Sequence, residues 1–398
     1  MAANVVGKPV RGGDFFNRSR EINDMWSRLE TDNILLLAPR RVGKTSLMYR
    51  LLDGAAERQF LPTYVSVADA PNELAFAQKL YDCVKDHKPA RKVIAAIAKS
   101  PLGRLFKSVK KVGLFGASVE LGEQAEQQWA QLSEALLSAF GRGPERWLLL
   151  IDELPIFVLS LLKQDPTGNR ARHFLNWFRN VRTDMKSGDH VRWLLAGSIG
   201  LDTVARRRNL GDTINDLYVY TDFGAFSPDT ADALLQDLAA SAKIALSPEV
   251  RSRICQRAGW LIPYHLQLLF SEIRKGFLRT LTQPTVEDVD AAYESLMDPA
   301  HRAYFDYWKQ RLHEELGPPE DGQAVEILHA AAKDPSGVTR STLLGVLSRH
   351  VQEPREREAR LHELLDVLRS DGYLIEHEGR VAFRSSMLRD FWLRRVMP

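Results

Sequence analysis

The sequence predicts an α/β fold in which helices cover both faces of a parallel five-stranded sheet, giving a three-layer core. Short apolar runs at 34–37, 64–67, 147–151, 191–198 and 217–221 alternate with segments whose apolar residues recur at helical spacing. The run at 147–151 is apolar throughout, which is typical of a strand buried between two helical layers. Beyond Pro228 only helical patterns follow, until two short apolar runs near the C-terminus.

The composition is that of an ordinary globular protein with two or three domains. The chain has 398 residues, of which 44% are hydrophobic and 26% are charged. A formal net charge of +3 gives no general electrostatic argument for nucleic-acid binding. Cys83 and Cys255 are isolated, which excludes a paired-cysteine zinc site and a disulfide framework. We therefore expect a cytoplasmic protein, and no apolar run is long enough to predict a membrane span.

The first strand, 34–37, runs into the most informative motif of the chain. Its residues are Ala38-Pro39-Arg40-Arg41-Val42-Gly43-Lys44-Thr45-Ser46, and a helical pattern follows. This layout is typical of a P-loop, in which backbone N–H groups surround the phosphates of a nucleotide. Lys44 is expected to reach the β- and γ-phosphates, and the Thr45 hydroxyl to bind Mg²⁺. The alternative is an ordinary strand-turn-helix with a chance Gly-Lys-Thr.

The third strand ends in two carboxylates, Asp152 and Glu153. Open parallel sheets bind ligands at the carboxyl ends of their strands. Asp152 is expected to hold Mg²⁺ through water, and Glu153 to polarise the water that attacks the γ-phosphate. The alternative is that this pair only caps the following helix. Beside the P-loop motif, the pair predicts a nucleoside triphosphatase.

The remaining patterns divide the chain into three predicted parts. The ATPase core spans 1–227 and includes a basic insertion at about 87–122. A helical lid spans 228–316, and a linker rich in proline and glycine, 317–322, follows it. Three helical patterns and a hairpin then predict a winged helix-turn-helix domain over 323–398.

These features together resemble the archaeal-type ATPase family, a branch of the AAA+ and STAND P-loop ATPases. The resemblance covers nearly the whole chain, and the segments that carry it are Phe16-Asn17-Arg18-Ser19-Arg20-Glu21, 38–47, Ile151-Asp152-Glu153-Leu154-Pro155, Ala196-Gly197-Ser198, Gly259-Trp260-Leu261-Ile262-Pro263-Tyr264 and 383–392. It implies ATP as the nucleotide with Mg²⁺, a helical lid and a C-terminal winged helix. The chain departs from the family at Ala38 and Asn17, and it has no obvious single arginine finger.

The resemblance also implies roles for residues outside the two motifs. Phe16 and Arg18 would belong to the nucleotide site, and Pro263 would pack against adenine. Ser198 would be a polar sensor that contacts the γ-phosphate or the attacking water. Arg207, in a run of three arginines, would supply a finger to a neighbouring subunit of a homo-oligomer. The simpler alternatives are a strand-end cap at Ser198, a helix start at Pro263 and a solvated arginine run.

Two segments are candidates for binding a partner. The stretch 88–111 contains eight Lys or Arg residues and no acidic residue, and its apolar residues fall on one helical face. Such a stretch binds DNA or another nucleic acid, an anionic membrane or a partner helix, or packs on the core as an insertion. The winged helix is the other DNA candidate, but residues 317–398 carry 12 Lys or Arg against 13 Asp or Glu, which disfavours phosphate binding.

The sequence therefore predicts an ATP-binding and ATP-hydrolysing switch that acts on an unidentified protein partner or on DNA. Two alternatives stay open. One is a nucleotide-gated DNA-binding regulator with little turnover, and the other is a signalling scaffold of a defence or conflict system.

Overall fold

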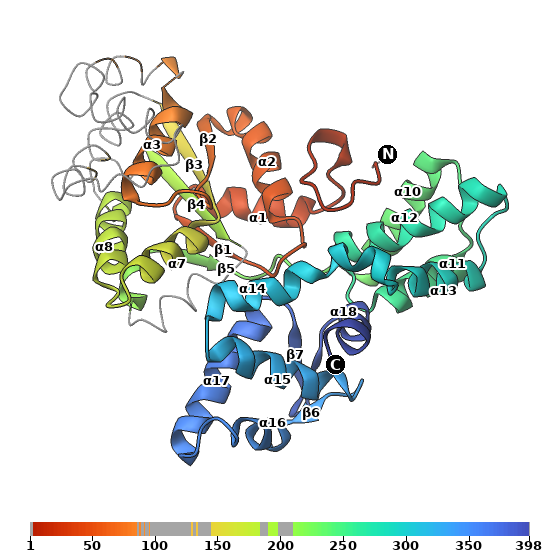
Figure 1. Cartoon of the computed structure of the whole chain (residues 1–398). Coiled ribbons are helices and arrows are strands. Elements are labelled where there is room, and N and C mark those ends of the chain that lie inside the picture. The colour runs from red at the N-terminus through yellow and green to blue at the C-terminus, as the bar shows by residue number, and fades with distance from the viewer. Residues whose placement is uncertain are drawn as a thin grey trace. The chain divides into compact units, whose positions relative to one another are not determined.

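The computed structural model describes residues 3–85, 145–183, 190–197 and 210–397, and positions 87, 88, 91, 95, 129 and 133 between them. The chain forms two compact units, and Figure 1 shows their elements. The sheet unit contains Arg18–Leu37 and Leu47–Asp222. The helical unit contains Met1–Asn17, Ala38–Ser46 and Phe223–Pro398.

The sheet unit is built on a five-stranded sheet with the order β2-β3-β4-β1-β5. Its strands are β1 (Ile34–Leu37), β2 (Phe60–Ser66), β3 (Arg146–Asp152), β4 (Val191–Gly197) and β5 (Tyr218–Tyr220). Every neighbouring pair is parallel, so the carboxyl ends of all five strands lie at one edge of the sheet. The predicted parallel five-stranded sheet is therefore confirmed.

Helices cover both faces of this sheet, because consecutive residues of β3 from Trp147 to Asp152 are all buried. The helices are α1 (Ser19–Leu29), α2 (Lys44–Gly54), α3 (Glu73–Val84), α7 (Leu154–Gln164) and α8 (Asn169–Thr183), and the first turn of α2 belongs to the helical unit. An aromatic cluster joins α3, α7 and α8, with the Phe76 ring centroid 5.2 Å from that of Phe157 and 5.0 Å from that of Phe174. These helices share one hydrophobic core with β3 and β4.

The lid of the helical unit consists of α10 (Pro228–Ala242), α11 (Pro248–Ala258), α12 (Pro263–Thr280) and α13 (Val286–Leu296). Ser227 and Ser247 cap α10 and α11, and each is followed by a proline at the first helical position. Thr285 and Asp288 form a capping box at the start of α13. A 3₁₀ segment, Pro299–Tyr304, and α14 (Asp306–Leu316) follow.

The C-terminal part has the arrangement of a winged helix. It contains α15 (Glu320–Ala332), β6 (Val338–Thr339), α16 (Arg340–Leu347), α17 (Pro354–Ser370), β7 (Leu374–His377), β8 (Arg380–Phe383), α18 (Ser386–Phe391) and a π-helical turn, Trp392–Val396. The strands form an antiparallel sheet in the order β6-β8-β7. The linker is shorter than the predicted 317–322, because α15 already begins at Glu320. No helix in the described ranges has both the length and the hydropathy that crossing a membrane requires.

Candidate nucleotide-binding site

The predicted phosphate-binding loop, Ala38–Ser46, follows β1 directly and leads into α2 at Lys44. Arg41 and Gly43 have left-handed backbones, with φ of 65° and 103°. Left-handed residues between right-handed ones turn successive N–H groups toward the same side, which creates a concave site for an anion. No heavy atom lies within 4 Å of the position a Cβ would take at Gly43. Glycine is therefore needed there for its backbone conformation and not for space.

Lys44 is only 7% exposed, and its ammonium group bonds back to the loop. Its Nζ donates to the carbonyl oxygens of Ala38, at 2.7 Å, and Pro39, at 2.8 Å. A buried ammonium needs such acceptors, and charged phosphate oxygens are stronger acceptors than neutral carbonyls. The cation and the loop amides together fit a phosphate group, so the loop residues are compatible with the nucleotide that the sequence predicts.

Two loop residues predicted to bind the nucleotide also anchor other parts of the helical unit. The Ser46 hydroxyl accepts a hydrogen bond from the Val10 N–H at 3.0 Å. The Arg41 guanidinium donates to the Gly7 carbonyl at 3.1 Å and to the Tyr307 hydroxyl at 3.3 Å. These bonds hold the N-terminal segment and α14 against the loop.

Aromatic rings support the same loop from the lid side. The Arg41 guanidinium lies 4.5 Å from the ring centroid of Tyr264 and 4.7 Å from that of Tyr307. The guanidinium of Arg40 lies 5.9 Å from the Tyr307 centroid. Sequence reasoning did not identify either tyrosine; the only signal was that Tyr264 follows Pro263 directly.

Three residues that the family resemblance places in the nucleotide site, Pro263, Phe16 and Arg18, each have different neighbours in the structure. Pro263 occupies the first position of α12, and its contact with adenine stays a prediction. The Phe16 ring packs edge-on against Phe226 at 6.4 Å. Arg18, in the sheet unit, is buried with φ of 80° and an ion pair of 2.8 Å to Glu21, and burial lowers the pKa of its guanidinium.

Asp152 lies at the carboxyl end of β3, where its carboxylate is buried and held by two donors. The Tyr64 hydroxyl donates to Oδ2 at 3.0 Å, and the Glu153 N–H donates to Oδ1 at 3.0 Å. Burial, followed by the charge of Asp152, raises the pKa of Tyr64, which therefore remains a donor. Tyr64 lies on the neighbouring strand β2, a position that the sequence could not relate to Asp152. A carboxylate oriented in this way suits a hydrated Mg²⁺ ion.

Glu153 has a backbone conformation that is rare for a residue other than glycine. Its φ is 61° and its ψ is 30°, and it occupies the N-cap position of α7. Its side chain makes no capping hydrogen bond, so the alternative role of a cap does not describe it. A left-handed backbone costs a side-chain-bearing residue on the order of 1 kcal/mol, and such strain clusters at functional sites.

The turn between α17 and β7 lies against the phosphate-binding loop. A Cβ added at Gly372, where φ is 89°, would lie 3.0 Å from the Pro39 Cβ and 2.8 Å from the Trp260 ring. Asp371 beside it is only 1% exposed, with one oxygen 3.6 Å from the Arg311 guanidinium. Burial raises the pKa of Asp371, against the opposing charges of Arg311, Arg40 and Lys44. Sequence reasoning missed this contact, and the only signal was the Asp-Gly-Tyr turn after a helix.

Three predicted features lie outside the described residues. These are Ser198, the arginine run that contains Arg207, and the basic stretch 88–111 apart from Lys88, Arg91 and position 95. Their roles stay predictions.

The chain is similar in fold to solved structures, among them the following two. It aligns with the Walker-type ATPase of Pyrococcus abyssi at 16% identity and a TM-score of 0.58, over 98% of this chain and 99% of that one. It also aligns with the structure of the ORC2 protein of Aeropyrum pernix in ADPNP–ADP complexes, at 14% identity and a TM-score of 0.53. This alignment covers 96% of this chain and 95% of the ORC2 chain. At these identities the likeness shows the fold, that of a P-loop NTPase. No known family model matches the sequence, and no curated protein matches it.

Proposed function

We propose that this protein is an ATP-binding and ATP-hydrolysing switch of the archaeal-type ATPase family. The observation that carries the proposal is the phosphate-binding loop, with its left-handed Arg41 and Gly43 and its buried Lys44. Asp152 and Glu153 follow β3, and the loop follows β1, in one parallel sheet. The fold similarity to the Walker-type ATPase of Pyrococcus abyssi and to the ORC2 protein, whose structure is of ADPNP–ADP complexes, supports nucleotide binding.

The proposed chemistry assigns each group one task. The loop amides and Lys44 bind the phosphates, and Thr45 and Asp152 hold the Mg²⁺ ion. The bound ion would neutralise charge on the β- and γ-phosphate oxygens. Glu153 orients a water molecule and accepts its proton, for which a carboxylate unused by the α7 cap is suited. Ser198 and Arg207 would complete the site as sensor and finger, in a homo-oligomer.

The winged helix is proposed to regulate the ATPase and not to read DNA by itself. The turn that contains Asp371 and Gly372 lies against Pro39 of the loop, and the charges of Arg40 and Lys44 oppose the rise that burial causes in the pKa of Asp371. Nucleotide binding to the loop would therefore be coupled to the seating of this turn.

Two arginines of α17 support this ranking because carboxylates of the same domain already bind them. Arg360 pairs with Glu320, and Arg369 pairs with Asp366 at 2.7 Å and Glu376 at 2.6 Å. A phosphate backbone would have to compete with these carboxylates. The DNA-binding regulator remains the second candidate, through the basic stretch 88–111, and the signalling scaffold rests on the family resemblance alone.

Phosphate release by a Glu153→Gln variant tests the proposed function. The amide cannot accept the proton, so ATP binding should persist while turnover falls by about a hundredfold or more. Glu57→Gln, an exposed carboxylate on the same unit, is the matched control and should keep full turnover. Wild-type turnover in Glu153→Gln would remove Glu153 from the mechanism. A wild-type protein without ATP turnover, with or without duplex DNA, would favour the binding regulator.

A further inference from the structure

Asp152, which is proposed to hold Mg²⁺, is itself held by a tyrosine of the neighbouring strand. The Tyr64 hydroxyl on β2 donates to Asp152 Oδ2 at 3.0 Å, and both residues belong to the sheet unit. Ser66 is the residue of β2 that pairs with Asp152, and Tyr64 precedes it by two positions. Side chains two positions apart lie on the same face of a sheet. The phenol therefore extends along β2 to the carboxylate at the end of β3.

A second tyrosine, Tyr49 of α2, packs against Tyr64. The two ring centroids lie 5.0 Å apart, with 60° between the ring planes. Aromatic pairs favour offset and tilted geometries over a face-to-face sandwich. The ring of Tyr64 is therefore positioned by packing on α2, and its hydroxyl by the bond to Asp152.

Donors from two directions orient the Asp152 carboxylate. Oδ2 accepts from Tyr64, and Oδ1 accepts from the Glu153 N–H at 3.0 Å. A bond to one oxygen alone lets a carboxylate rotate, whereas bonds to both oxygens set its plane. Mg²⁺ demands near-octahedral geometry, so a carboxylate that accepts from the water ligands of the ion must be well oriented. Groups that orient a metal-binding side chain typically contribute about tenfold to a hundredfold in metal affinity or activity.

The pairing of Tyr64 with Asp152 is costly for the fold alone. Asp152 is only 4% exposed, and the residues before it on β3, from Trp147 to Ile151, are buried and apolar. A buried carboxylate costs free energy even where hydrogen bonds satisfy it. An apolar residue at the end of β3 and a phenylalanine on β2 would pack without this cost. The pair is therefore better explained by chemistry at this edge of the sheet than by stability.

We propose that Tyr64 is a positioning residue for Mg²⁺, whose hydroxyl holds the Asp152 carboxylate in the orientation that the hydrated ion needs. Tyr64 acts through Asp152 and is assigned no contact with the nucleotide. This inference rests on the proposed ATPase function and adds to it a residue that neither the phosphate-binding loop nor the carboxylates after β3 contain. Loss of the hydroxyl should weaken the contribution of Mg²⁺ to nucleotide binding and leave the contribution of the phosphates unchanged.

The binding of ADPNP, an ATP analogue that is not hydrolysed, tests the proposal. Isothermal titration measures its affinity in Mg²⁺ and in EDTA for the full wild-type chain and for Tyr64→Phe. The ratio of the two affinities is the gain from Mg²⁺, and chelation of the ion by free ADPNP contributes equally for both proteins. We expect Tyr64→Phe to lower this gain by about tenfold or more and to keep the affinity in EDTA. The variant keeps the ring that packs on Tyr49, and its melting temperature shows whether it is folded.

A double substitution shows whether the hydroxyl acts through Asp152. Asp152→Ala should lose most of the gain from Mg²⁺, and adding Tyr64→Phe to it should cause no further loss. A further loss as large as the one in the wild-type background would contradict the proposal, because the hydroxyl would then act on another group.

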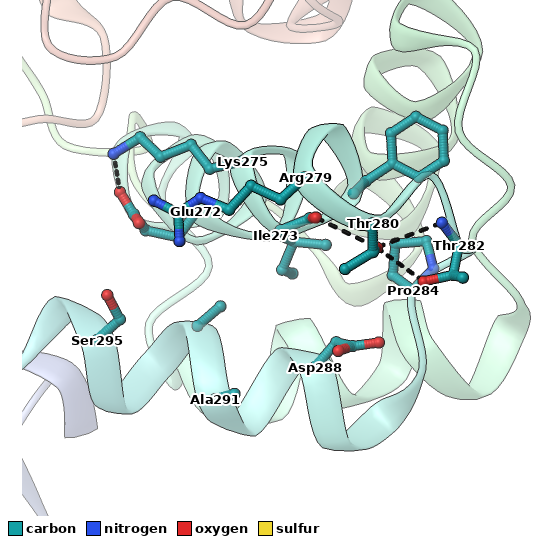
Figure 2. Close-up of a pocket in the computed structure, with 13 residues that line it drawn as sticks. Glu272, Ile273, Lys275, Arg279, Thr280, Thr282, Pro284, Asp288, Ala291 and Ser295 are labelled. Atoms are coloured by element: carbon teal, nitrogen blue, oxygen red, sulfur yellow. Dashed lines mark hydrogen bonds and ion pairs between the residues drawn. The ribbon is translucent and has the colours of Figure 1, made fainter.

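Two other hydroxyl groups provide controls. Tyr218→Phe removes the hydroxyl of a tyrosine on β5, the strand at the opposite edge of the same sheet from β2. Thr280→Val removes a hydroxyl in the pocket of about 190 Å³ between α12 and α13, where it lies 2.7 Å from the Thr282 hydroxyl (Figure 2). Both variants should keep the wild-type gain from Mg²⁺.

The outcomes separate this inference from the proposed function. A wild-type gain in Tyr64→Phe, with or without a lower melting temperature, would overturn the positioning role and leave the ATPase proposal standing. A wild-type protein whose affinity for ADPNP does not rise with Mg²⁺ would contradict the proposed Mg²⁺ site, and this inference with it.

Discussion

Glu153 combines a strained backbone with a carboxylate at the carboxyl edge of the sheet. Its φ of 61° lies in the region that glycine occupies without cost, yet the chain has a glutamate there. The helix that follows gains no cap from this side chain. The proposed role in hydrolysis supplies one reason for retaining this strain.

Two substitutions of Glu153 separate the role of its carboxylate in turnover from the cost of its backbone conformation. Glu153→Gly removes the carboxylate and the strain, whereas Glu153→Ala removes only the carboxylate. Both variants should lose turnover, but the glycine variant should have a free energy of unfolding higher by about 1 kcal/mol. Chemical denaturation of the two proteins measures the difference. An alanine variant as stable as the glycine variant would contradict the strained conformation.

His265 is a residue whose protonation should make the stability of the fold depend on pH. It is fully buried in α12, with Nδ1 3.3 Å from the Trp260 carbonyl oxygen and 3.4 Å from the Ser385 hydroxyl. Burial is the main cause that lowers the pKa of His265 to about 4, and the positive charge of Arg41 adds to it. The imidazole is therefore neutral in the folded protein at neutral pH.

Mild acid should destabilise the helical unit through His265. The unfolded chain binds a proton at this histidine below a pH of about 6.5, whereas the folded chain does so only near pH 4. The free energy of unfolding should therefore fall as the pH decreases across this window, by up to about 3 kcal/mol. Denaturation at pH 7 and pH 4.5 measures the loss, and His265→Gln should show less of it. Equal losses in the two proteins would assign the acid sensitivity to other groups.

At the scale of elements, the turn between α17 and β7 connects the winged helix to the phosphate-binding loop. Gly372 allows its backbone to lie against Pro39 and the Trp260 ring, and Asp371 is buried next to it. The turn therefore lies close to the loop that the nucleotide is proposed to occupy. The proposed regulatory role of the winged helix rests on this contact.

A side chain at Gly372 should weaken this contact. Gly372→Ala adds a Cβ 2.8 Å from the Trp260 ring and 3.0 Å from Pro39, so the turn must move away from the loop. We expect lower stability, by about 1–3 kcal/mol, together with a changed affinity for ATP. Gly379→Ala is the control, because Gly379 also has a positive φ, of 73°, but no atom near its Cβ position. Identical effects of the two substitutions would leave backbone strain as the whole explanation.

The sequence predicted the strands and the two motifs because their signals are local. The apolar run of β3 and the Gly-Lys-Thr after β1 are visible in a few consecutive residues. The linker was predicted too long, because Glu320 and Asp321 favour a helix N-terminus more than the neighbouring prolines disfavour it.

The partners of the site residues could not be predicted, because they are distant along the chain. Tyr64 and Asp152 are 88 positions apart, and Arg41 and Tyr307 are 266 positions apart. Positive φ angles at Arg41 and Glu153 were equally hidden, since residues of these types usually avoid that region. Periodicity reports which face of an element is buried, but it does not report which distant side chain meets it.

At the scale of the whole molecule, the phosphate-binding loop joins the two compact units through the chain itself. Ala38–Ser46 belongs to the helical unit, whereas the residues before and after it, Arg18–Leu37 and Leu47–Asp222, belong to the sheet unit. A ligand bound to this loop would therefore contact a segment of the helical unit that the chain joins on both sides to the sheet unit. The proposed nucleotide-dependent switch would act through this connection of the chain.

The affinity of the full chain for ATP with Mg²⁺ tests the central claim most directly. Isothermal titration should compare wild type, Lys44→Ala and the control Lys333→Ala, with melting temperatures recorded to show that each protein is folded. The buried ammonium of Lys44 is the loop cation that the phosphates need, so its loss should weaken ATP binding by about a hundredfold or more, while the control binds as wild type does. Equal affinity of folded Lys44→Ala and wild type for ATP would contradict the account.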